Sequence, residues 1–381
     1  MRFPEFTEEW VNVSLKDVAD FQKERISSGL LDESTYISTE NILQNFQGVQ
    51  SAISIPANTN VVAYKKNDIL LSNIRPYLKK VWFSDKIGGC SADVFVLRSK
   101  TCEPEFLYNV IASDKFINYV MSGAKGVKMP RGDKNQMESF SFSIPAVAEQ
   151  RKISRLFQLL DERIATQNKI IEDLKKLKSA ISKHLFARKD LLETTICLSN
   201  IATLKNGYAF QSGKYNALGK WKILTITNVS GERYINDEDY NCIINLPNDI
   251  QDHQVLKEGD ILISLTGNVG RVSLCKDGDY LLNQRVGLLQ LAKNVNQEFL
   301  YQILSSQRFE NSMIACGQGA AQMNIGKGDV ESYVLPYSSN VNNILLVAKI
   351  LHSYDEYIIN EQRKLTLLTM QKQYFLAQMF I

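Results

Sequence analysis

The sequence predicts an α/β (mixed α+β) protein with two similar globular domains, separated by a long antiparallel two-helix coiled coil that gives the single chain pseudo-two-fold symmetry. Three observations predict this fold. The chain repeats itself, each half ends in a long amphipathic segment with a heptad repeat, and each half begins with a mixed pattern of strands and helices. The predicted boundaries are residues 1–146 for the first globular domain, 147–190 for the first long helix, 191–340 for the second domain and 341–381 for the second long helix.

The composition is typical of a folded globular protein. The chain has 381 residues, 44% of them hydrophobic, and a net charge of +3, whereas disordered chains are poorer in apolar residues and less balanced in charge. No apolar run approaches the roughly 18 residues of a membrane-spanning helix, and the early acidic pair Glu8-Glu9 is unlike a secretory signal. We therefore expect a soluble cytoplasmic protein without membrane association. The six cysteines lie far apart without a C-x-x-C pair, which argues against a structural metal site.

The second half of the chain repeats the first at offsets near 192 to 194 residues. Lys66–Ser72 matches Glu258–Ser264, and Glu105–Tyr108 matches Glu298–Tyr301. Further matches follow in the same order: Met137–Phe140 with Val330–Tyr333, Pro145 with Pro336, and Asp161-Glu162 with Asp355-Glu356. Several matches in one order indicate a tandem duplication.

Each half begins with short strands and helices. Runs rich in β-branched residues predict strands, at Asp68–Ser72, Val94–Leu97, Lys222–Thr227 and Asp260–Leu265. Apolar residues at three-to-four spacing predict one helix over residues 105–121 and another over 298–314. Glycine-rich loops follow both helices, and Pro145 and Pro336 end the mixed regions.

Each half ends in a long helix with a two-position heptad seam. In the first helix one row is Ile153, Leu160, Gln167, Leu174 and Ile181, and the other is Phe157, Ile164, Ile171, Lys178 and Leu185. In the second helix the equivalent rows are Val347, Tyr354, Glu361, Leu368 and Phe375, and Leu351, Ile358, Leu365, Lys372 and Met379. Such a stripe can pack on its own domain, but two related stripes in one chain favour an intramolecular pair. Two-fold symmetry makes the pair antiparallel, and we expect Gln167 near Lys372 and Glu361 near Lys178.

The motifs of common catalytic sites are missing from the sequence. There is no Asp/Asn-Pro-Pro-aromatic motif, no H-E-x-x-H and no G-x-S-x-G, and Gly326-Lys327-Gly328 lacks the hydroxyl residue of a phosphate loop. Gly267-Asn268-Val269-Gly270 has GxxG spacing, but alone this pattern favours a tight turn over a backbone-clamping loop. We expect a chain that binds and positions other molecules and does not catalyse a reaction itself.

Several segments together resemble one known family. They are Phe3-Pro4-x-Phe6, Leu15-x-Asp17-Val18-Ala19, Ile144-Pro145 with Glu149-Gln150, Asn206–Phe210, Gly259–Ser264 with Gly267–Val272, and Gly319–Ile325. Over essentially its whole length the chain resembles the specificity (S) subunit of type I restriction-modification enzymes. The second junction lacks the Glu-Gln pair after Pro336, and the first middle loop reads Asn73–Tyr77, differences that suit domains with different DNA preferences.

The resemblance implies a role and partners. Each globular domain would be a target-recognition domain for one half of a bipartite site in double-stranded DNA, and the helical pair would fix the gap between the halves. Two methyltransferase (M) subunits would dock on the chain, and restriction (R) subunits would join them. S-adenosylmethionine, ATP and magnesium are then expected only on the partner subunits.

Candidate DNA-binding residues are polar and basic side chains in the predicted loops. Arg suits guanine, Asn and Gln suit adenine, and Lys suits phosphate. In the first domain they are Arg75, Tyr77, Lys79, Lys80, Lys128, Arg131 and Lys134. In the second domain they are Tyr208, Asn268, Arg271, Gln284, Arg285, Gln322, Asn324 and Lys327. For any one of them, a phosphate contact or plain surface remains an alternative to base reading.

Two other functions stay open at this point. A coiled-coil scaffold or adaptor without DNA specificity would need the same long helices. An autonomous nuclease with a divergent metal site would need a compact Asp/Glu/Lys constellation, which the sequence does not suggest. Specific retention of the chain on duplex DNA would argue against the scaffold. Magnesium-dependent cleavage of DNA by the chain alone would favour the nuclease.

Overall fold

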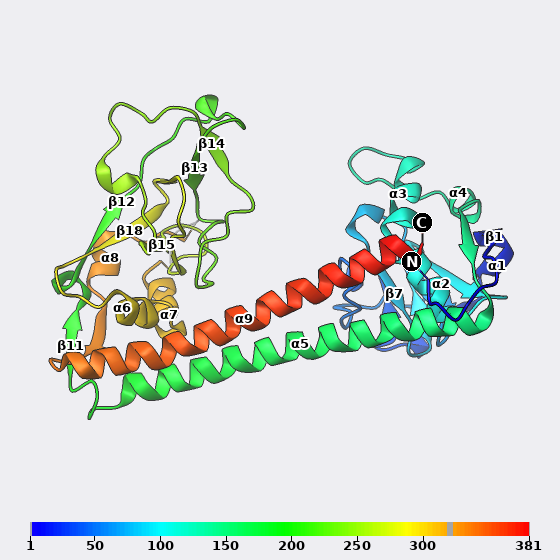
Figure 1. The fold of residues 1–381 in the computed structure, drawn as a ribbon, viewed down its shortest axis with the longest axis horizontal. Coiled ribbons are helices and arrows are strands. Elements are labelled where there is room, and N and C mark those ends of the chain that lie inside the picture. Colours follow the sequence, from blue (N-terminus) through cyan, green and yellow to red (C-terminus); the bar gives the residue numbers. More distant parts are fainter. Residues whose placement is uncertain (1, 318–322, 381) are drawn as a thin grey trace. The chain divides into compact units, whose positions relative to one another are not determined.

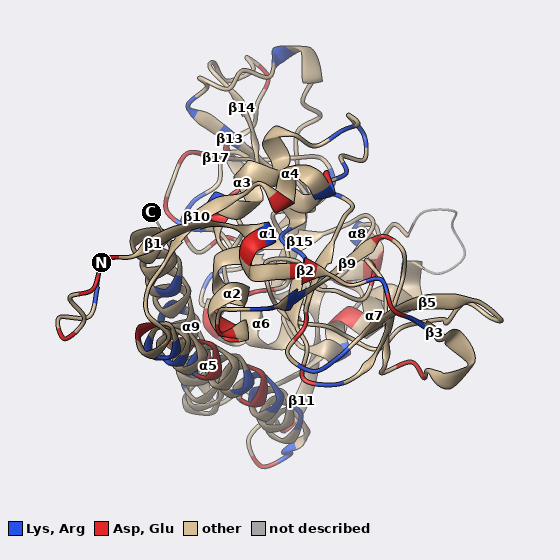
Figure 2. Cartoon of the chain, turned by 90° about the vertical axis from the view of Figure 1, so that its right-hand side faces the viewer, with Lys and Arg blue, Asp and Glu red and all other residues tan. Residues whose placement is uncertain are grey.

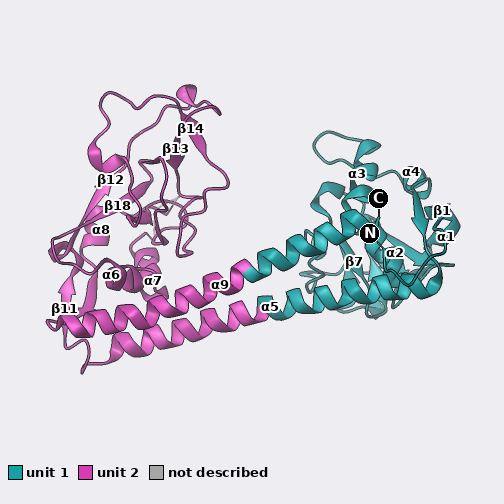
Figure 3. Cartoon of the chain, viewed as in Figure 1, with its two compact units in different colours: residues 1–168, 364–381 teal, residues 169–363 magenta. Residues whose placement is uncertain are grey.

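The computed structural model describes residues 2–317 and 323–380. The chain forms two compact units, one of residues 1–168 and 364–381 and the other of residues 169–363 (Figure 3). Within the described residues, no helix is both long and apolar enough to cross a membrane.

Two long helices contribute to both units. Helix α5 is Val147–Ala187 and helix α9 is Val341–Met379. Because the boundary between the units cuts both helices, each unit consists of one globular domain and one end of each long helix.

The first globular domain combines two four-stranded sheets with short helices (Figure 1). One sheet has the order β2-β9-β6-β7, the other β3-β5-β8-β4, and β1 pairs with β10. The strands are β1 (Val11–Ser14), β2 (Ala19–Phe21), β3 (Arg25–Ser27), β4 (Tyr36–Ile37), β5 (Asn60–Tyr64), β6 (Ile69–Ser72), β7 (Val81–Phe83), β8 (Gly88–Cys90), β9 (Val94–Ser99) and β10 (Ser141–Ile144). The helices are α1 (Leu15–Val18), α2 (Pro104–Ile111), α3 (Asp114–Ser122), α4 (Lys134–Glu138) and the 3₁₀ turns η1 (Ser28–Leu30) and η2 (Pro76–Leu78).

The second globular domain repeats this plan. Its main sheet has the order β12-β18-β15-β16, β11 pairs with β19, and a three-stranded sheet has the order β14-β13-β17. The strands are β11 (Thr194–Cys197), β12 (Ala202–Asn206), β13 (Trp221–Leu224), β14 (Asn241–Ile243), β15 (Ile261–Ser264), β16 (Val272–Leu274), β17 (Tyr280–Leu282), β18 (Val286–Leu291) and β19 (Val334–Tyr337). The helices are α6 (Gln297–Leu304), α7 (Gln307–Gly317), α8 (Lys327–Glu331) and the turns η3 (Leu198–Asn200), η4 (Ser212–Lys214) and η5 (Asp252–Gln254). The main sheets match strand for strand, which confirms the duplication.

The main sheet of each domain is buried on both faces. In β6, Ile69 and Leu71 enter the cluster with the helices, whereas Leu70 enters a second cluster on the opposite face. In β15, Ile261 and Ile263 likewise face one cluster and Leu262 the other. Side chains alternate along a strand, so these near-continuous apolar runs supply two cores at once.

The ends of the long helices complete the cores of the domains. In the first unit, Phe157 of α5 and Phe380 of the α9 end stack with ring centroids 6.1 Å apart, beside Phe106 of α2. In the second unit, Leu185 of α5 and Leu351 of α9 belong to the core that contains β15 and α6. The heptad seams therefore bury their terminal residues against a globular domain as well as against each other.

The helices predicted over residues 105–121 and 298–314 are each broken in two, so the prediction of single helices was wrong. The first segment, α2, ends at Ile111, and Ser113 is the N-cap of the second segment, where its hydroxyl accepts a hydrogen bond from the Phe116 amide at 3.2 Å. Ser306 lies at the equivalent break, with its hydroxyl 3.4 Å from the Phe309 amide. Serine competes for backbone hydrogen bonds and favours a helix start over a helix interior, and this outweighs the apolar spacing.

The two seam lysines form ion pairs, one inside each unit. Lys372 donates to Asp161 in the first unit, and Lys178 donates to Asp355 in the second, both at 2.5 Å. The two pairs are equivalent in the repeat, so the pseudo-symmetry extends to the seam. Asp161 and Asp355 stand six residues before Gln167 and Glu361, the residues expected near Lys372 and Lys178. Those two expected contacts stay a prediction.

Candidate nucleic-acid interface

In each domain, backbone hydrogen bonds tie the middle loop to the late loop. In the first domain the Arg75 amide donates to the Pro130 carbonyl at 2.8 Å, and the Gly132 amide donates to the Asn73 carbonyl at 3.1 Å. We call this pair of bonds the loop clamp. It brings the segment after β6 against the segment before α4, more than 50 residues later, and makes one surface of two loops.

The second domain contains the same clamp at the equivalent positions. The Gly267 amide donates to the Met323 carbonyl at 3.0 Å, and the Ile325 amide donates to the Leu265 carbonyl at 2.9 Å. Only main-chain atoms make these bonds. The side chains that the two clamps present can therefore differ without loss of the loop geometry.

The middle loop of the first domain has two basic residues in the left-handed backbone region. Arg75 has φ 51° and Lys79 has φ 53°, on either side of the turn η2. Tyr77 between them is 48% exposed. A left-handed conformation costs an L-residue other than glycine roughly 1–2 kcal/mol, and such strain concentrates at functional sites. Arg75 is exposed, whereas Lys79 forms an ion pair with Asp114 at 2.5 Å.

The other first-domain candidates differ in whether their charged groups are exposed and whether they have a partner within the domain. Lys128 lies in the exposed loop beside the clamp. Arg131, which bridges to Ile74, forms an ion pair with Asp93 at 2.9 Å but stays 53% exposed. Two candidates have partners within the domain: Lys80 donates to the Thr39 carbonyl at 2.5 Å, and Lys134 pairs with Glu138 and lies over the Phe21 ring.

In the second domain, backbone bonds join most candidates into one region. The Gln284 amide donates to the Tyr208 carbonyl, and the Leu265 amide donates to the Arg285 carbonyl, both at 3.0 Å. Leu265 in turn accepts from Ile325 in the clamp. Gln284, Arg285, Asn268 and Asn324 are all exposed there, so the polar side chains surround the clamp. Lys327, in the first turn of α8, is 53% exposed and lies near Glu331 at 3.7 Å.

Two second-domain candidates need separate mention. Arg271 turns toward Glu310 at 3.5 Å and lines a hollow of about 210 Å³ with Ser305 and Ser306. Gln322 lies outside the described residues.

Tyr208 borders a pocket that the sequence analysis did not predict. Its hydroxyl donates to Asp249 at 2.8 Å, and this bond raises the pKa of the phenol. The pocket has a volume of about 440 Å³, and its lining includes Phe210, Lys214 and Asn245. No motif marks Lys214 or Asn245, because only the fold brings the segment around η4 and the segment after β14 to Tyr208.

Cys90 and Cys275 are buried in apolar clusters of their domains. Burial raises the pKa of the Cys90 and Cys275 thiols to about 12, so these two residues are protonated at neutral pH. Over residues 2–317 and 323–380, no group of three or more His, Cys, Asp or Glu side chains is placed to hold a metal ion.

Comparison with known proteins identifies relatives over most of the chain. The family model described as "Type I restriction modification DNA specificity domain" matches twice, over residues 7–176 and 193–370. The type I restriction enzyme MjaVIII specificity subunit of Methanocaldococcus jannaschii is 26% identical over 335 residues, which cover 80% of this chain and 77% of that protein. The EcoDI specificity subunit of Escherichia coli is 23% identical over 191 residues, covering 48% of this chain and 43% of that protein.

Solved structures share the fold. The type I restriction-modification S subunit from M. genitalium aligns with a TM-score of 0.59 and 16% identity, over 98% of this chain and 96% of that one. A chain from a study of complex assembly and conformational transition of the type I R-M system aligns with a TM-score of 0.60 and 17% identity, over 98% of both chains.

Proposed function

Since the chain belongs to the family of DNA specificity subunits of type I restriction-modification enzymes, we propose that each globular domain reads one half of a bipartite site in double-stranded DNA. The observation that carries this proposal is the loop clamp, which recurs at equivalent positions of both domains. One loop scaffold present twice in a chain suits a substrate that offers two sites of the same kind. Duplex DNA does so, since its groove repeats with each helical turn.

The two half-sites should differ in sequence, because the equivalent residues at the two clamps differ. Arg75 corresponds to Gly267, and Arg131 corresponds to Asn324. Arg pairs with guanine in the major groove and Asn with adenine. Arg131 and Asn324 are both exposed and both bridge to the middle loop, which makes them our first candidates for base reading.

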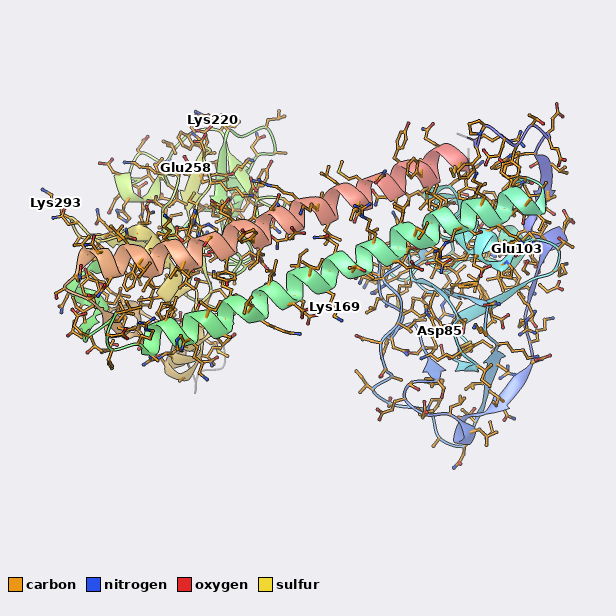
Figure 4. All side chains as sticks on the ribbon, turned by 60° about the horizontal axis from the view of Figure 1, so that its bottom comes forward. Asp85, Glu103, Lys169, Lys220, Glu258 and Lys293 are labelled. Atoms are coloured by element: carbon orange, nitrogen blue, oxygen red, sulfur yellow. The ribbon has the colours of Figure 1, made fainter. Side chains whose placement is uncertain are left out.

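The long helices supply the gap and the docking surface in this proposal. Side chains project all round α5 and α9, Lys169 of α5 among them (Figure 4). Acidic and basic residues are interspersed along both helices (Figure 2). In the first unit, α9 exposes an apolar face that we call the α9 stripe: Leu367, Met370 and Tyr374, which are 66%, 59% and 57% exposed. Large apolar side chains at i, i+3 and i+7 form one helix face, and such exposed faces mark protein interfaces.

The proposed partners of these helices are two methyltransferase (M) subunits, with restriction (R) subunits joining the complex. The methyl donor S-adenosylmethionine would bind to the M subunits, and ATP and magnesium to the R subunits. The chain itself then contributes DNA specificity and no catalytic group, and it acts in the cytoplasm, where the methylated chromosome lies.

Methylation mapping tests the proposal directly. The chain is co-expressed with the methyltransferase encoded beside it, and methylated adenines are mapped across the host genome. We expect a motif of two different half-sites with a fixed gap, which disappears when this gene is deleted. Unchanged methylation after deletion would contradict the proposal and favour the scaffold without DNA specificity.

A further inference from the structure

A buried arginine ties the second globular domain to the long helices within the second unit. Arg233 lies in the loop between β13 and β14, and its side chain is 7% exposed. Its Nη1 and Nη2 atoms donate to the two carboxylate oxygens of Glu298 on α6 at 2.9 and 2.6 Å. Nη1 also donates to Asp355 of α9 at 3.0 Å. One side chain therefore joins the β13–β14 loop, the domain helix α6 and the long helix α9.

Asp355 extends this cluster to α5. It accepts from Lys178 of α5 at 2.5 Å and from Gln302 of α6 at 2.6 Å, and its side chain is 8% exposed. We call Arg233, Glu298, Asp355, Lys178 and Gln302 the Arg233 cluster. The four charged members balance, two positive and two negative, so the cluster can be buried without excess charge.

Such a cluster orients its parts more than it stabilises them. Desolvation of buried ions offsets most of their attraction, so balanced apolar replacements often leave the stability unchanged. Bidentate arginine–carboxylate bonds nevertheless require one relative geometry, whereas apolar surfaces can slide and repack. The specific consequence of the Arg233 cluster is therefore a fixed orientation of the second domain on α5 and α9.

The first unit has different contacts at the equivalent position. Tyr301 has the Arg233 guanidinium over its ring at 5.1 Å, whereas the repeat-equivalent Tyr108 packs on Phe83 with ring centroids 5.5 Å apart. Asp161, equivalent to Asp355, pairs with Lys372. The duplication alone therefore does not require an arginine here.

We propose that Arg233 is a positioning residue, which fixes the orientation of the second recognition domain on the helical pair. This orientation determines the length of the gap between half-sites that the subunit accepts in DNA. This inference rests on the proposed function. A domain free to rotate about its attachment would accept half-sites at neighbouring spacings, and a domain held by directional bonds would accept one.

A charge-balanced double variant tests this role. Arg233→Met with Glu298→Gln removes one positive and one negative member and leaves the Lys178–Asp355 pair intact. The matched control is Lys175→Gln with Glu232→Gln, which removes an ion pair of 2.7 Å between α5 and the same loop, 43% and 53% exposed. Neither pair of substitutions changes the net charge of the chain. Arg233→Lys, which keeps the charge and loses the bidentate fork, is the second variant, measured in place of the first if that one does not fold.

The assay uses each variant in complex with its methyltransferase subunits. The probes are duplexes that carry the site obtained by methylation mapping, with the gap lengthened or shortened by one or two base pairs, and a duplex with the second half-site alone. Initial methylation rates and binding affinities are measured on each probe, and circular dichroism checks folding.

Wild type and the control should prefer one gap. For the Arg233 variant we expect the preference for that gap over its neighbours to fall about tenfold, the equivalent of one charged hydrogen bond, with unchanged binding to the single half-site. A folded variant with the wild-type gap profile would overturn the positioning role. Wild type without any gap preference would instead contradict the proposed function on which the inference rests.

Discussion

Replacing Arg75 by glycine should separate the stability of the first loop clamp from its contact with DNA. Arg75 has φ 51°, a conformation that costs about 1–2 kcal/mol in an L-residue and almost nothing in glycine, while glycine costs roughly 0.5–1 kcal/mol more in conformational entropy. The difference lies between zero and about 1.5 kcal/mol in favour of Arg75→Gly. The clamp itself survives, since only the amide of residue 75 donates to Pro130.

The effect on DNA binding has the opposite sign. A base contact from arginine is worth about 1–3 kcal/mol, so Arg75→Gly should weaken binding to the cognate site by about 5-fold to 150-fold. If Arg75 contacts phosphate instead, the loss should be similar on all sequences, and the dependence on salt should decrease by about one unit of slope.

The assays are thermal unfolding and fluorescence anisotropy with cognate and scrambled duplexes at several salt concentrations, both on the complex with the methyltransferase subunits. For a unit of this size the midpoint should stay constant or rise by up to about 5 °C. Asn58→Gly is the matched control, because Asn58 has φ 50° in the same domain but lies outside the clamped loops. Unchanged cognate affinity, or a clear loss of stability, would refute the reasoning.

Leu367→Lys with Met370→Lys on the α9 stripe should abolish co-purification with the methyltransferase subunits while leaving the circular dichroism spectrum unchanged; undiminished co-purification would exclude this face as the docking surface. Ser113→Ala should lower the free energy of unfolding by about 0.5–2 kcal/mol in denaturant titrations, since it removes the cap of α3. The pKa of Glu193 is lowered to about 2 by its hydrogen bonds, foremost with Ser338, so its contribution to the stability of the fold is present above pH 4.5 and is lost as the pH falls toward 2. Glu193→Gln should therefore reduce the difference between the unfolding midpoints at pH 5 and pH 2. An unaltered difference would contradict this prediction.

The repeat and the heptad seams predicted the fold because both depend on patterns within the chain. Ile69–Leu71 and Ile261–Ile263 are apolar at every position, which is what a sheet buried on both faces requires. The broken helices were not predicted, because Ser113 lowers the apolar periodicity only slightly while its hydroxyl caps the start of a new helix. Local hydrogen bonds of this kind are weak signals in a sequence pattern.

The candidate site could be predicted only in part, for a different physical reason. The loops after β6 and β15 could be predicted from the sequence. Their partners Pro130 and Met323 could not, because they are bound through backbone atoms, which every residue type has. The Arg233 cluster is equally hidden, since Glu298 and Asp355 are 65 and 122 residues from Arg233. Long-range polar contacts depend on the tertiary path of the chain, which periodicity does not report.

The use of main-chain bonds in both clamps bears on how the two domains diverged after duplication. A clamp made by side chains would restrict the residues that face DNA, because each change would also loosen the loops. With the clamp in the backbone, Arg131 and Asn324 can occupy equivalent bridge positions and present different hydrogen-bonding groups. The orientation that we propose for the second domain depends on side chains elsewhere, because the Arg233 cluster lies outside the clamped loops, in the β13–β14 loop and in α5, α6 and α9. This division between backbone bonds and side-chain contacts explains why the sheets and seams keep the repeat while the loops differ in sequence.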